Sequence, residues 1–422
     1  MRRPNVLEVA QRGIRAGGRL ADGSAARTFL VATVPVCAVY AATASWWSAQ
    51  SPDTFTNLLT ARSVADRGSI YLDEDQMLTE LADYGVSIVP TGDGHLVGRY
   101  PPAAGLHAVP FFLLVRGETQ PVSPDPLTRQ PPRPLGEYRV PPTWPGALTS
   151  VLLAAGAVGM LALTFRLFTN GATAVGAAYL FGLGTSVWSV AADELWQHTT
   201  GIFWIALSGY LVARARAGSG ALTYGIATAV RPLNAIIGGA VVVREGLSRR
   251  WQHGLLLAAG LAGGLAVVLG TNAVVFGSPS IQGGYRSGDV LSDREGLGAL
   301  WFPFNYVRGL LHPRYGLLVW SPFLALLLAR VHRAWRTAPD WCRGPALGGA
   351  LYLVVHWTLH RASGGAGFYF YRYPLEPLTA AAPLLVWTYL DQIRSRPRWN
   401  AVFGRCVLVA IVGHTIGALA LR

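Results

Sequence analysis

The sequence contains no lysine, so all 35 of its basic residues are arginines. Charged residues of both signs make up only 14% of the chain, against about a quarter in a typical soluble domain. The formal net charge is nevertheless +13. Because the arginines stand in short stretches between apolar runs rather than on one polar face, the charge argues against nucleic-acid binding.

Cysteine is also scarce, and Cys37, Cys342 and Cys406 lie far apart in or beside apolar segments. That spacing predicts neither a disulfide framework nor a zinc site. The sequence lacks a glycine-rich phosphate loop of the P-loop type, which argues against a nucleotide site of that kind. Solenoid repeats and the inverted repeats of many transporters are not visible either.

Apolar residues are abundant, at 51% of the chain. Runs of roughly 17–25 apolar residues recur, whereas a transmembrane barrel would show short alternating segments. The predicted fold class is therefore all-α, a polytopic transmembrane helical bundle in which 28–422 forms a single domain with about 11 membrane segments. The predicted spans are 28–47, 146–165, 172–190, 199–213, 221–230, 233–243, 254–276, 315–328, 345–360, 374–390 and 402–421.

Two parts of this layout stay open. Segment 233–243 is too short to cross a bilayer straight on, so it and 221–230 can form one helix kinked at Pro232. Residues 1–27 are rich in arginine, and the apolar run that follows ends in Trp46-Trp47 rather than in small residues. This pattern predicts a cytoplasmic segment followed by a retained helix, not a cleaved signal peptide.

The distribution of arginine predicts the orientation. With the N-terminus in the cytoplasm, roughly twenty arginines and about five acids fall on the inner side, against roughly fifteen and about seventeen outside. This segregation requires 101–115 to lie along the membrane. The protein is then a multi-pass plasma-membrane protein whose outer face carries a large loop, 48–145, and two smaller ones, 277–314 and 361–373.

The large loop opens with Asp53. Ser51 and Pro52 predict a helix start there, with Asp53 in the first turn and Asn57 one turn further on the same face. A carboxylate at the membrane boundary is costly to place, so Asp53 is a candidate general base or metal ligand. Asn57 and Arg62 are candidate substrate-binding residues. The alternative is that Asp53 only complements the positive end of the helix.

The same loop holds two further candidates. The run Asp73-Glu74-Asp75 can supply a second carboxylate or bind a divalent cation, or it is simply solvated surface. Arg99 precedes Tyr100-Pro101-Pro102, where a lipid phosphate is expected at the membrane interface. The alternative is an ordinary interfacial helix start.

A short outer connection, 191–198, is dense in polar groups. Glu194 and His198 are candidates for a second acid or base. Trp196 and Gln197 are candidate substrate-binding residues, because an indole stacks on a sugar and an amide holds its hydroxyls. Charge alone is weak evidence in a loop, and His198 can instead be an interfacial histidine.

Later segments supply further cations and aromatic residues. Arg231 lies between apolar runs and must pair or reach water, so it binds a phosphate or forms a structural ion pair. Arg372 stands at the edge of the span 374–390. Tyr285 and Tyr371, in the two smaller outer loops, are candidate substrate-binding residues, although aromatic residues are common at membrane interfaces.

Several short stretches, taken in order, carry a family resemblance: Asp53 after the first span, Tyr100-Pro101-Pro102, Gly184 to Trp188 leading into Leu195 to His198, Ala227 to Pro232, Tyr315 to Pro322, and Gly364-Gly365 through Arg372-Tyr373. Their order and sidedness, from residue 28 to about residue 389, resemble the GT-C superfamily of integral membrane glycosyltransferases. That superfamily includes bacterial aminoarabinose transferases, protein O-mannosyltransferases, and actinobacterial mannosyl- and arabinofuranosyltransferases.

The resemblance implies inverting transfer of a mannose- or arabinofuranose-type sugar from a polyprenyl-phosphate donor. The acceptor would be an extracytoplasmic hydroxyl of envelope glycan, lipid or protein. Asp53 would deprotonate that hydroxyl, and Arg231, Arg372 and Arg99 would bind the lipid phosphate. Because no second acid stands directly beside Asp53, the sequence neither requires nor excludes a divalent cation.

Two other functions fit the same features. A transporter or flippase of a lipid-linked sugar would use the same arginines and aromatic residues, but transporters place polar groups near the bilayer midplane. A non-catalytic scaffold could recruit partners through the proline-rich stretch 120–142. The gathering of polar groups at the outer boundary favours the enzyme.

Overall fold

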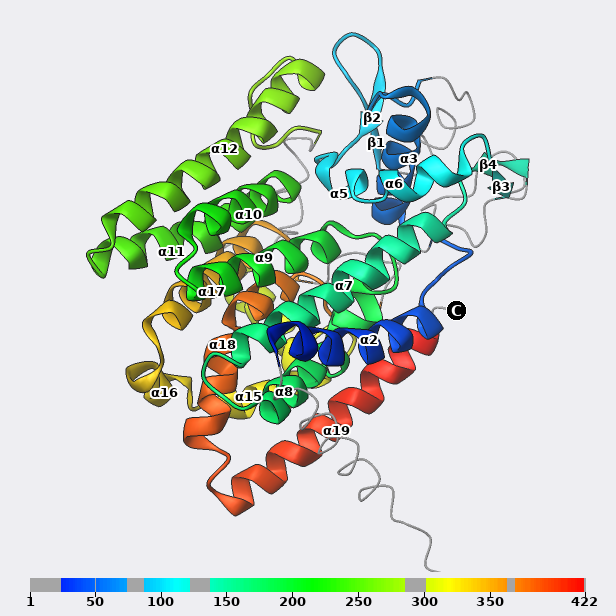
Figure 1. Ribbon diagram of the computed structural model, residues 1–422. Helices are drawn as coiled ribbons and strands as arrows, with labels where there is room; N and C mark the ends of the chain where they lie inside the picture. Colours follow the sequence, from blue (N-terminus) through cyan, green and yellow to red (C-terminus); the bar gives the residue numbers. More distant parts are fainter. Residues whose placement is uncertain are drawn as a thin grey trace, which may run out of the picture.

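The structure is a computed structural model that describes residues 24–49, 51–73, 87–121, 137–284, 301–362 and 369–420. Within these residues the chain is mainly helical, as predicted, with two short antiparallel hairpins (Figure 1). The α-helices are α2 (Ala25–Thr43), α3 (Pro52–Arg67), α5 (Ala103–Leu106), α6 (Val109–Phe112), α7 (Trp144–Phe165), α8 (Gly171–Leu183), α9 (Gln197–Ala213), α10 (Ala217–Val230), α11 (Ala235–Leu247), α12 (Trp251–Phe276), α13 (Trp301–Leu311), α14 (Leu317–Trp320), α15 (Phe323–Leu328), α16 (Val331–Thr337), α17 (Asp340–Leu359), α18 (Leu375–Gln392) and α19 (Pro397–Ala420).

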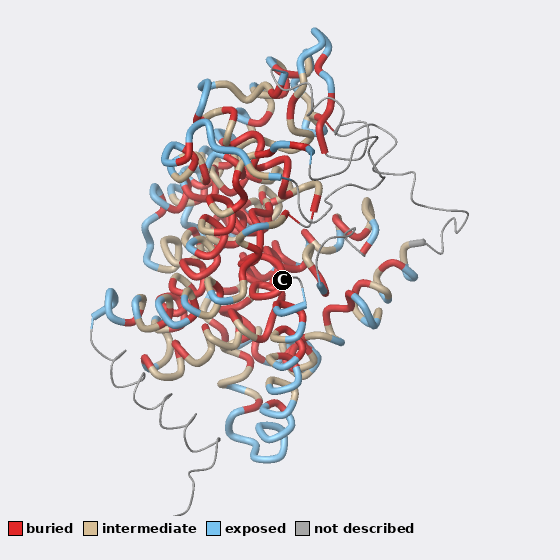
Figure 2. Tube along the Cα trace, turned by 90° about the vertical axis from the view of Figure 1, so that its right-hand side faces the viewer, coloured by how far each residue is buried: buried red, intermediate tan, exposed pale blue. Residues whose placement is uncertain are grey.

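Four of these helices are long and apolar enough to cross a membrane, namely α2, α7, α12 and α19. Helices α2, α12 and α19 each carry two or more large apolar side chains on their outer surface, such as Val34, Val274 and Ile416, which are 58%, 77% and 62% exposed. Such a surface suits lipid rather than water. Helix α7 is mostly buried, and Figure 2 shows the buried residues concentrated in the middle of the bundle. The chain is therefore a helical membrane protein.

Helices α10 and α11 are two antiparallel helices, so the kinked-helix alternative is wrong. Arg231 is extended, and a 3-10 turn, η4 (Pro232–Asn234), reverses the chain. Pro232 has no N–H to continue α10, and it disfavours a helical conformation at the residue before it. Helix α10 runs parallel to α12, because Ala221 lies against Gly260 and Gly225 against Gly264. Helix α11 runs antiparallel to α12, because Gly238 lies against Leu261 and Val242 against Gly254.

Most described residues of the segment 48–145 form a cap at one end of the helices (Figure 1). Its centre is α3, which buries Phe55 and Leu58 in a small apolar core with Phe112 and Tyr138. Strand β1 (Ile88–Pro90) pairs with β2 (Leu96–Gly98), and β3 (Gln120–Pro121) pairs with β4 (Arg139–Val140).

The segment predicted to lie along the membrane is broken into short pieces. Helices α5 and α6 have four residues each, and a 3-10 turn, η1 (Leu113–Val115), follows them. Each piece is far too short to cross a bilayer, since about 20 residues are needed. Both helices pack against α3, so this segment belongs to the cap.

Candidate active site

A cavity of about 290 Å³ lies where the cap meets the helix bundle. It is lined by the start of α3, by the stretch before α5, and by the ends of several bundle helices. The residues that line it are Asp53, Asn57, Tyr100, Pro101, Trp196, Gln197, His198, Arg231, Pro232, Leu233, Asn272, Ile281, Gln282, Gly283, His356, Leu359, His360, Arg372 and Tyr373. The cavity therefore joins residues from distant parts of the chain in one polar site.

Asp53 is the carboxylate that projects into this cavity from the cap. The Ser51 side chain caps helix α3 by accepting a hydrogen bond from the Asp53 N–H, and Pro52 is the first helical residue, as the sequence predicts. Asp53 Oδ1 accepts hydrogen bonds from Tyr100 at 2.5 Å and from Ser87 at 3.0 Å. Asp53 Oδ2 accepts one from Arg372 Nη1 at 2.8 Å.

These contacts keep Asp53 ionised. Burial by itself raises the pKa of the carboxyl, but the charge of Arg372 and the hydrogen bonds from Tyr100, Arg372 and Ser87 outweigh it. The net result is a pKa below the usual value for aspartate. The Asp53 side chain stays 22% exposed, so its carboxylate remains accessible to a ligand in the cavity.

Arg372 reaches Asp53 from the loop before α18 and is held between aromatic rings. Its guanidinium carbon lies 4.7 Å from the ring centre of Trp196 and 5.1 Å from that of Tyr373. Cations bind aromatic faces at such distances. Burial opposes the charge of Arg372, but Tyr373 and Asp53 together raise its pKa, so it stays a cation.

A second charged group lies deeper in the same site. His198 Nδ1 lies 2.7 Å from Glu376 Oε2, and Arg231 Nη1 lies 2.8 Å from His198 Nε2 and 2.9 Å from His198 Nδ1. Arg231 also lies 3.7 Å from Glu376 Oε1. Both ring nitrogens of His198 thus have protein partners, and the residue links Arg231 to Glu376.

Some polar atoms at the cavity have no protein partner among the described residues. They include the Gln197 side-chain amide nitrogen and both ring nitrogens of His356. His356 is 3% exposed and packs against Tyr373, with ring centres 3.9 Å apart. A buried polar group without a partner is costly, and such groups at a cavity wall are typical of a ligand site.

Four of the other sequence candidates fall at or next to the cavity. Asn57 lines it and donates to the carbonyl of Leu195 at 2.8 Å, which ties α3 to the turn before α9. Trp196 and Gln197 line it directly. Glu194 lies beside it and accepts a hydrogen bond from Thr54, so it anchors the cap instead of facing the cavity.

The remaining candidates lie elsewhere. Asp73 binds His95 Nδ1 and the Leu96 N–H near the turn of the β1–β2 hairpin, because the hairpin folds these residues back on it. Arg62 pairs with Asp66 along α3 and donates to the carbonyl of Val115 at 2.6 Å. Both residues therefore serve the structure of the cap.

Two further candidates, Arg99 and Tyr371, do not line the cavity either. Arg99 follows β2, and its backbone contacts Gly284. Tyr371 is buried within the bundle, where its hydroxyl lies 2.7 Å from Ser321 Oγ. Tyr285 and the acids 74 and 75 lie outside the described residues.

Sequence reasoning missed His356, Glu376 and Asn272. Each of them stands inside or at the edge of a run that was interpreted only as a membrane span. Ionisable and strongly polar residues within such runs usually mark functional positions, and this signal was available in the sequence.

Metal binding gains no support from the described residues, in which no cluster of three or more His, Cys, Asp or Glu side chains is suited to a metal ion. When the sequence is compared with known proteins, no family model and no curated protein matches it, so the function is inferred from the site itself.

Proposed function

We propose that this protein is a membrane glycosyltransferase that uses a polyprenyl-phosphate sugar as donor. It moves a sugar of the mannose or arabinofuranose type to an acceptor hydroxyl of envelope glycan, lipid or protein. The active site is the Asp53 cavity, which faces the extracytoplasmic side of a bundle of about eleven spans. In this proposed orientation the N-terminus lies in the cytoplasm.

The observation that carries the proposal is the combination of one ionised carboxylate with two arginines in a single cavity. Asp53 contacts Arg372 directly, and Arg231 lines the same cavity beside His198. A transferase needs a base for the incoming hydroxyl and cations for the departing phosphate. An ionised carboxylate accepts at about four lone-pair positions, so Asp53 can take a further hydrogen bond from a substrate.

The reaction follows from this arrangement. The acceptor oxygen attacks the anomeric carbon as its proton passes to Asp53, and the bond from that carbon to the phosphate oxygen breaks. The lipid leaves as a phosphate monoester, whose added negative charge is stabilised by Arg372 and Arg231. Guanidinium groups suit this task because they bind phosphate in a bidentate manner.

The neutral groups of the cavity suit a sugar. Trp196 and Tyr373 offer aromatic faces, and Gln197 and His356 offer hydrogen-bonding atoms that lack protein partners. Sugars are bound by this mixture of ring stacking and hydrogen bonds to hydroxyls. The position of these groups at the ends of the helices favours an enzyme over a transporter that binds at the midplane.

The test compares purified wild type with Asp53→Asn and Asp66→Asn in proteoliposomes. Radiolabelled polyprenyl-phosphate mannose and arabinofuranose are the donors, and a crude envelope fraction is the acceptor. Asp66 is the control, because it lies on the same helix but pairs with Arg62 away from the cavity. We expect wild type and Asp66→Asn to transfer sugar, and Asp53→Asn to lose about 10²-fold or more.

Equal activity of Asp53→Asn and wild type would exclude Asp53 as the base. If no donor supports transfer but lipid-linked sugars move between leaflets, the protein is a transporter instead. A scaffold would show neither activity.

A further inference from the structure

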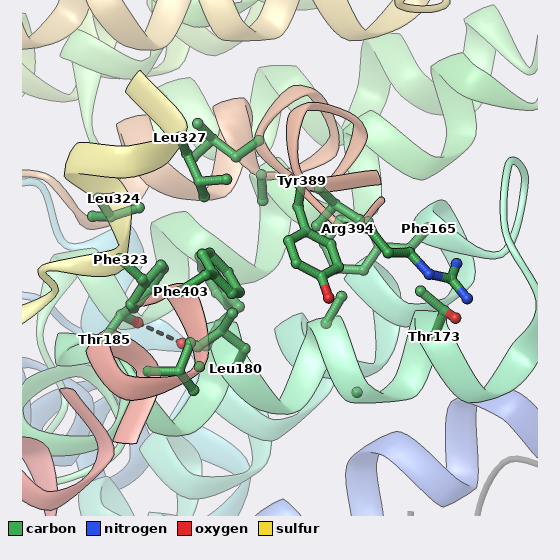
Figure 3. A pocket seen from close by; sticks show the side chains of 18 of the residues that line it. Phe165, Thr173, Leu180, Thr185, Phe323, Leu324, Leu327, Tyr389, Arg394 and Phe403 are labelled. Carbon is green, nitrogen blue, oxygen red and sulfur yellow. Dashed lines mark hydrogen bonds between the residues drawn. The ribbon is translucent and has the colours of Figure 1, made fainter. Parts of the chain in front are cut away.

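A second and larger cavity, of about 680 Å³, lies among the membrane helices (Figure 3). It is mostly apolar, and α7, α8, α15, α18 and α19 form its walls. Its lining comprises Phe165, Ala172, Thr173, Gly176, Ala177, Leu180, Phe181, Thr185, Phe323, Leu324, Leu327, Leu378, Ala382, Leu385, Val386, Tyr389, Arg394, Asn400, Phe403, Gly404 and Val407. It shares no residue with the Asp53 site.

The cavity extends along helix α18. The residues of α18 that line it run from Leu378 to Tyr389 along one face, a length of about 16 Å at the usual helical rise. Two of the long apolar helices, α7 and α19, contribute Phe165 and Phe403. The space therefore lies within the thickness of a membrane, and it is elongated along the direction of a lipid chain.

One end of this cavity is cationic. Figure 3 shows Arg394 beside Tyr389 and close to Thr173. The Tyr389 hydroxyl donates to Asn400 Oδ1 at 2.9 Å. The Arg394 guanidinium is exposed and has neither an ion pair nor a hydrogen bond within the described ranges. A lone cation thus stands at the polar end of an apolar space.

Tryptophans place this end at a membrane surface. Trp387 lies near the end of α18, and Trp399 lies near the start of α19, where Arg330 stacks on it at 4.5 Å. Tryptophan and arginine are enriched at the level of lipid headgroups. Arg394 therefore stands where the phosphate of a membrane lipid stands.

We propose that this cavity binds one anionic phospholipid, with an acyl chain along α18 and the phosphate on Arg394. The charge of Arg394 selects the anionic headgroup, and the apolar walls take the chain. The polyprenyl donor is a less suitable occupant, because its sugar must reach Asp53. Arg394 and Arg372 flank opposite ends of α18, which is about 27 Å long, nearly the thickness of a bilayer core.

The test measures which lipids stay bound to the purified protein. Each variant is placed in nanodiscs of equal parts dioleoyl-phosphatidylglycerol and dioleoyl-phosphatidylcholine, and native mass spectrometry then identifies the retained lipids. Gly176→Leu and Gly404→Leu fill the cavity, and at both positions an added Cβ meets open space. Gly209→Leu on α9 is the control, since it also has open space but lies outside the cavity.

We expect wild type and Gly209→Leu to retain one phosphatidylglycerol, and the two cavity-filling variants to lose it. Arg394→Ala should lower the preference for phosphatidylglycerol about tenfold, the value of one charge-assisted contact. Arg398→Ala, an exposed neighbour that does not line the cavity, should leave it unchanged. Thermal unfolding of all variants identifies any that fail to fold.

Three results would overturn the inference. The first is retention that the cavity-filling variants do not alter. The second is equal retention of the two phospholipids by wild type. The third is recovery of polyprenyl phosphate as the lipid that Gly176→Leu and Gly404→Leu displace.

Discussion

Arg372 Nη1 donates to Asp53 Oδ2 at 2.8 Å, although 319 residues separate the two along the chain. Asp53 belongs to the cap and Arg372 to the loop that leads into α18. The contact therefore joins the cap to the bundle at the wall of the cavity. Its chemistry can be tested by replacing Arg372 with a cation of different shape.

Arg372→Lys should reduce kcat/KM for sugar transfer by about 10²-fold, even though the charge is kept. Lysine offers one compact ammonium, so it cannot hold Asp53 and a phosphate at once while stacking on Trp196. Steady-state kinetics with whichever polyprenyl-phosphate sugar supports transfer measure the effect. The matched control is Arg314→Lys at an exposed position. Equal losses of kcat/KM in both variants would contradict the role of Arg372 in holding Asp53 and the phosphate.

The acid limb of the pH profile should respond to Tyr100. Because the pKa of Asp53 lies below the usual aspartate value, Asp53 stays charged until the pH falls below its own lowered pKa. If Asp53 is the base, activity is lost only there. Tyr100→Phe removes one of the hydrogen bonds that lower this pKa, so the acid limb of kcat/KM should move to higher pH. Tyr369→Phe, at an exposed ring, should leave it in place. If the acid limb of kcat/KM does not move in Tyr100→Phe, that limb reports the titration of a group other than Asp53.

Glu376→Gln should destabilise the protein by about 3–5 kcal/mol, because it leaves Arg231 without its buried counter-ion. Thermal unfolding in detergent, compared with Asp391→Asn at the exposed end of α18, measures the cost. The double variant Glu376→Gln with Arg231→Gln should lose less than the sum of the single variants. Strict additivity would show that the two residues do not interact.

His356→Phe should separate activity from stability. The variant keeps the ring packed on Tyr373 and removes two nitrogens that have no protein partner, so the unfolding temperature should stay the same or rise. If these nitrogens hold a substrate hydroxyl, KM should rise about tenfold. A fall in stability with unchanged KM would give His356 a structural role only. His253→Phe, at a partly exposed site far from the cavity, is the control.

The close packing of α10 on α12 should be sensitive to one methyl group. A Cβ on Gly225 would stand 2.6 Å from the carbonyl oxygen of Gly260, whereas one on Gly263 meets open space. Gly225→Ala should therefore lower stability by about 1–3 kcal/mol, and Gly263→Ala should be neutral or slightly stabilising. Thermal unfolding of Gly225→Ala and Gly263→Ala measures the difference. Similar unfolding temperatures for the two variants would show that α10 and α12 move apart at little cost.

Local features of the site were predictable from the sequence. Ser51 and Pro52 specify the start of α3 because a side-chain cap and a residue without an N–H both act within one turn. That start places Asp53 in the first helical turn. The helical class followed in the same way from the lengths of the apolar runs.

Long-range features were harder to predict. Asp73 meets His95 only because a hairpin turns the chain back, which a run of acids does not reveal. Pro232 within an apolar stretch is compatible with a kink or with a reversal, and packing against α12 decides between them. The convergence of Arg231, His198 and Glu376 depends on three helix ends meeting.

The order of these residues along the chain has a consequence for biosynthesis. Asp53 and most of the cap are synthesised before the bundle helices that complete the site, and Arg372 follows Asp53 by 319 residues. Until then, Asp53 lacks the guanidinium it binds in the finished protein, and Arg231 lacks its carboxylate. A nascent chain released before residue 372 would therefore expose an incomplete site, so the cavity acquires its charge balance only after residues 372 and 376 have been added.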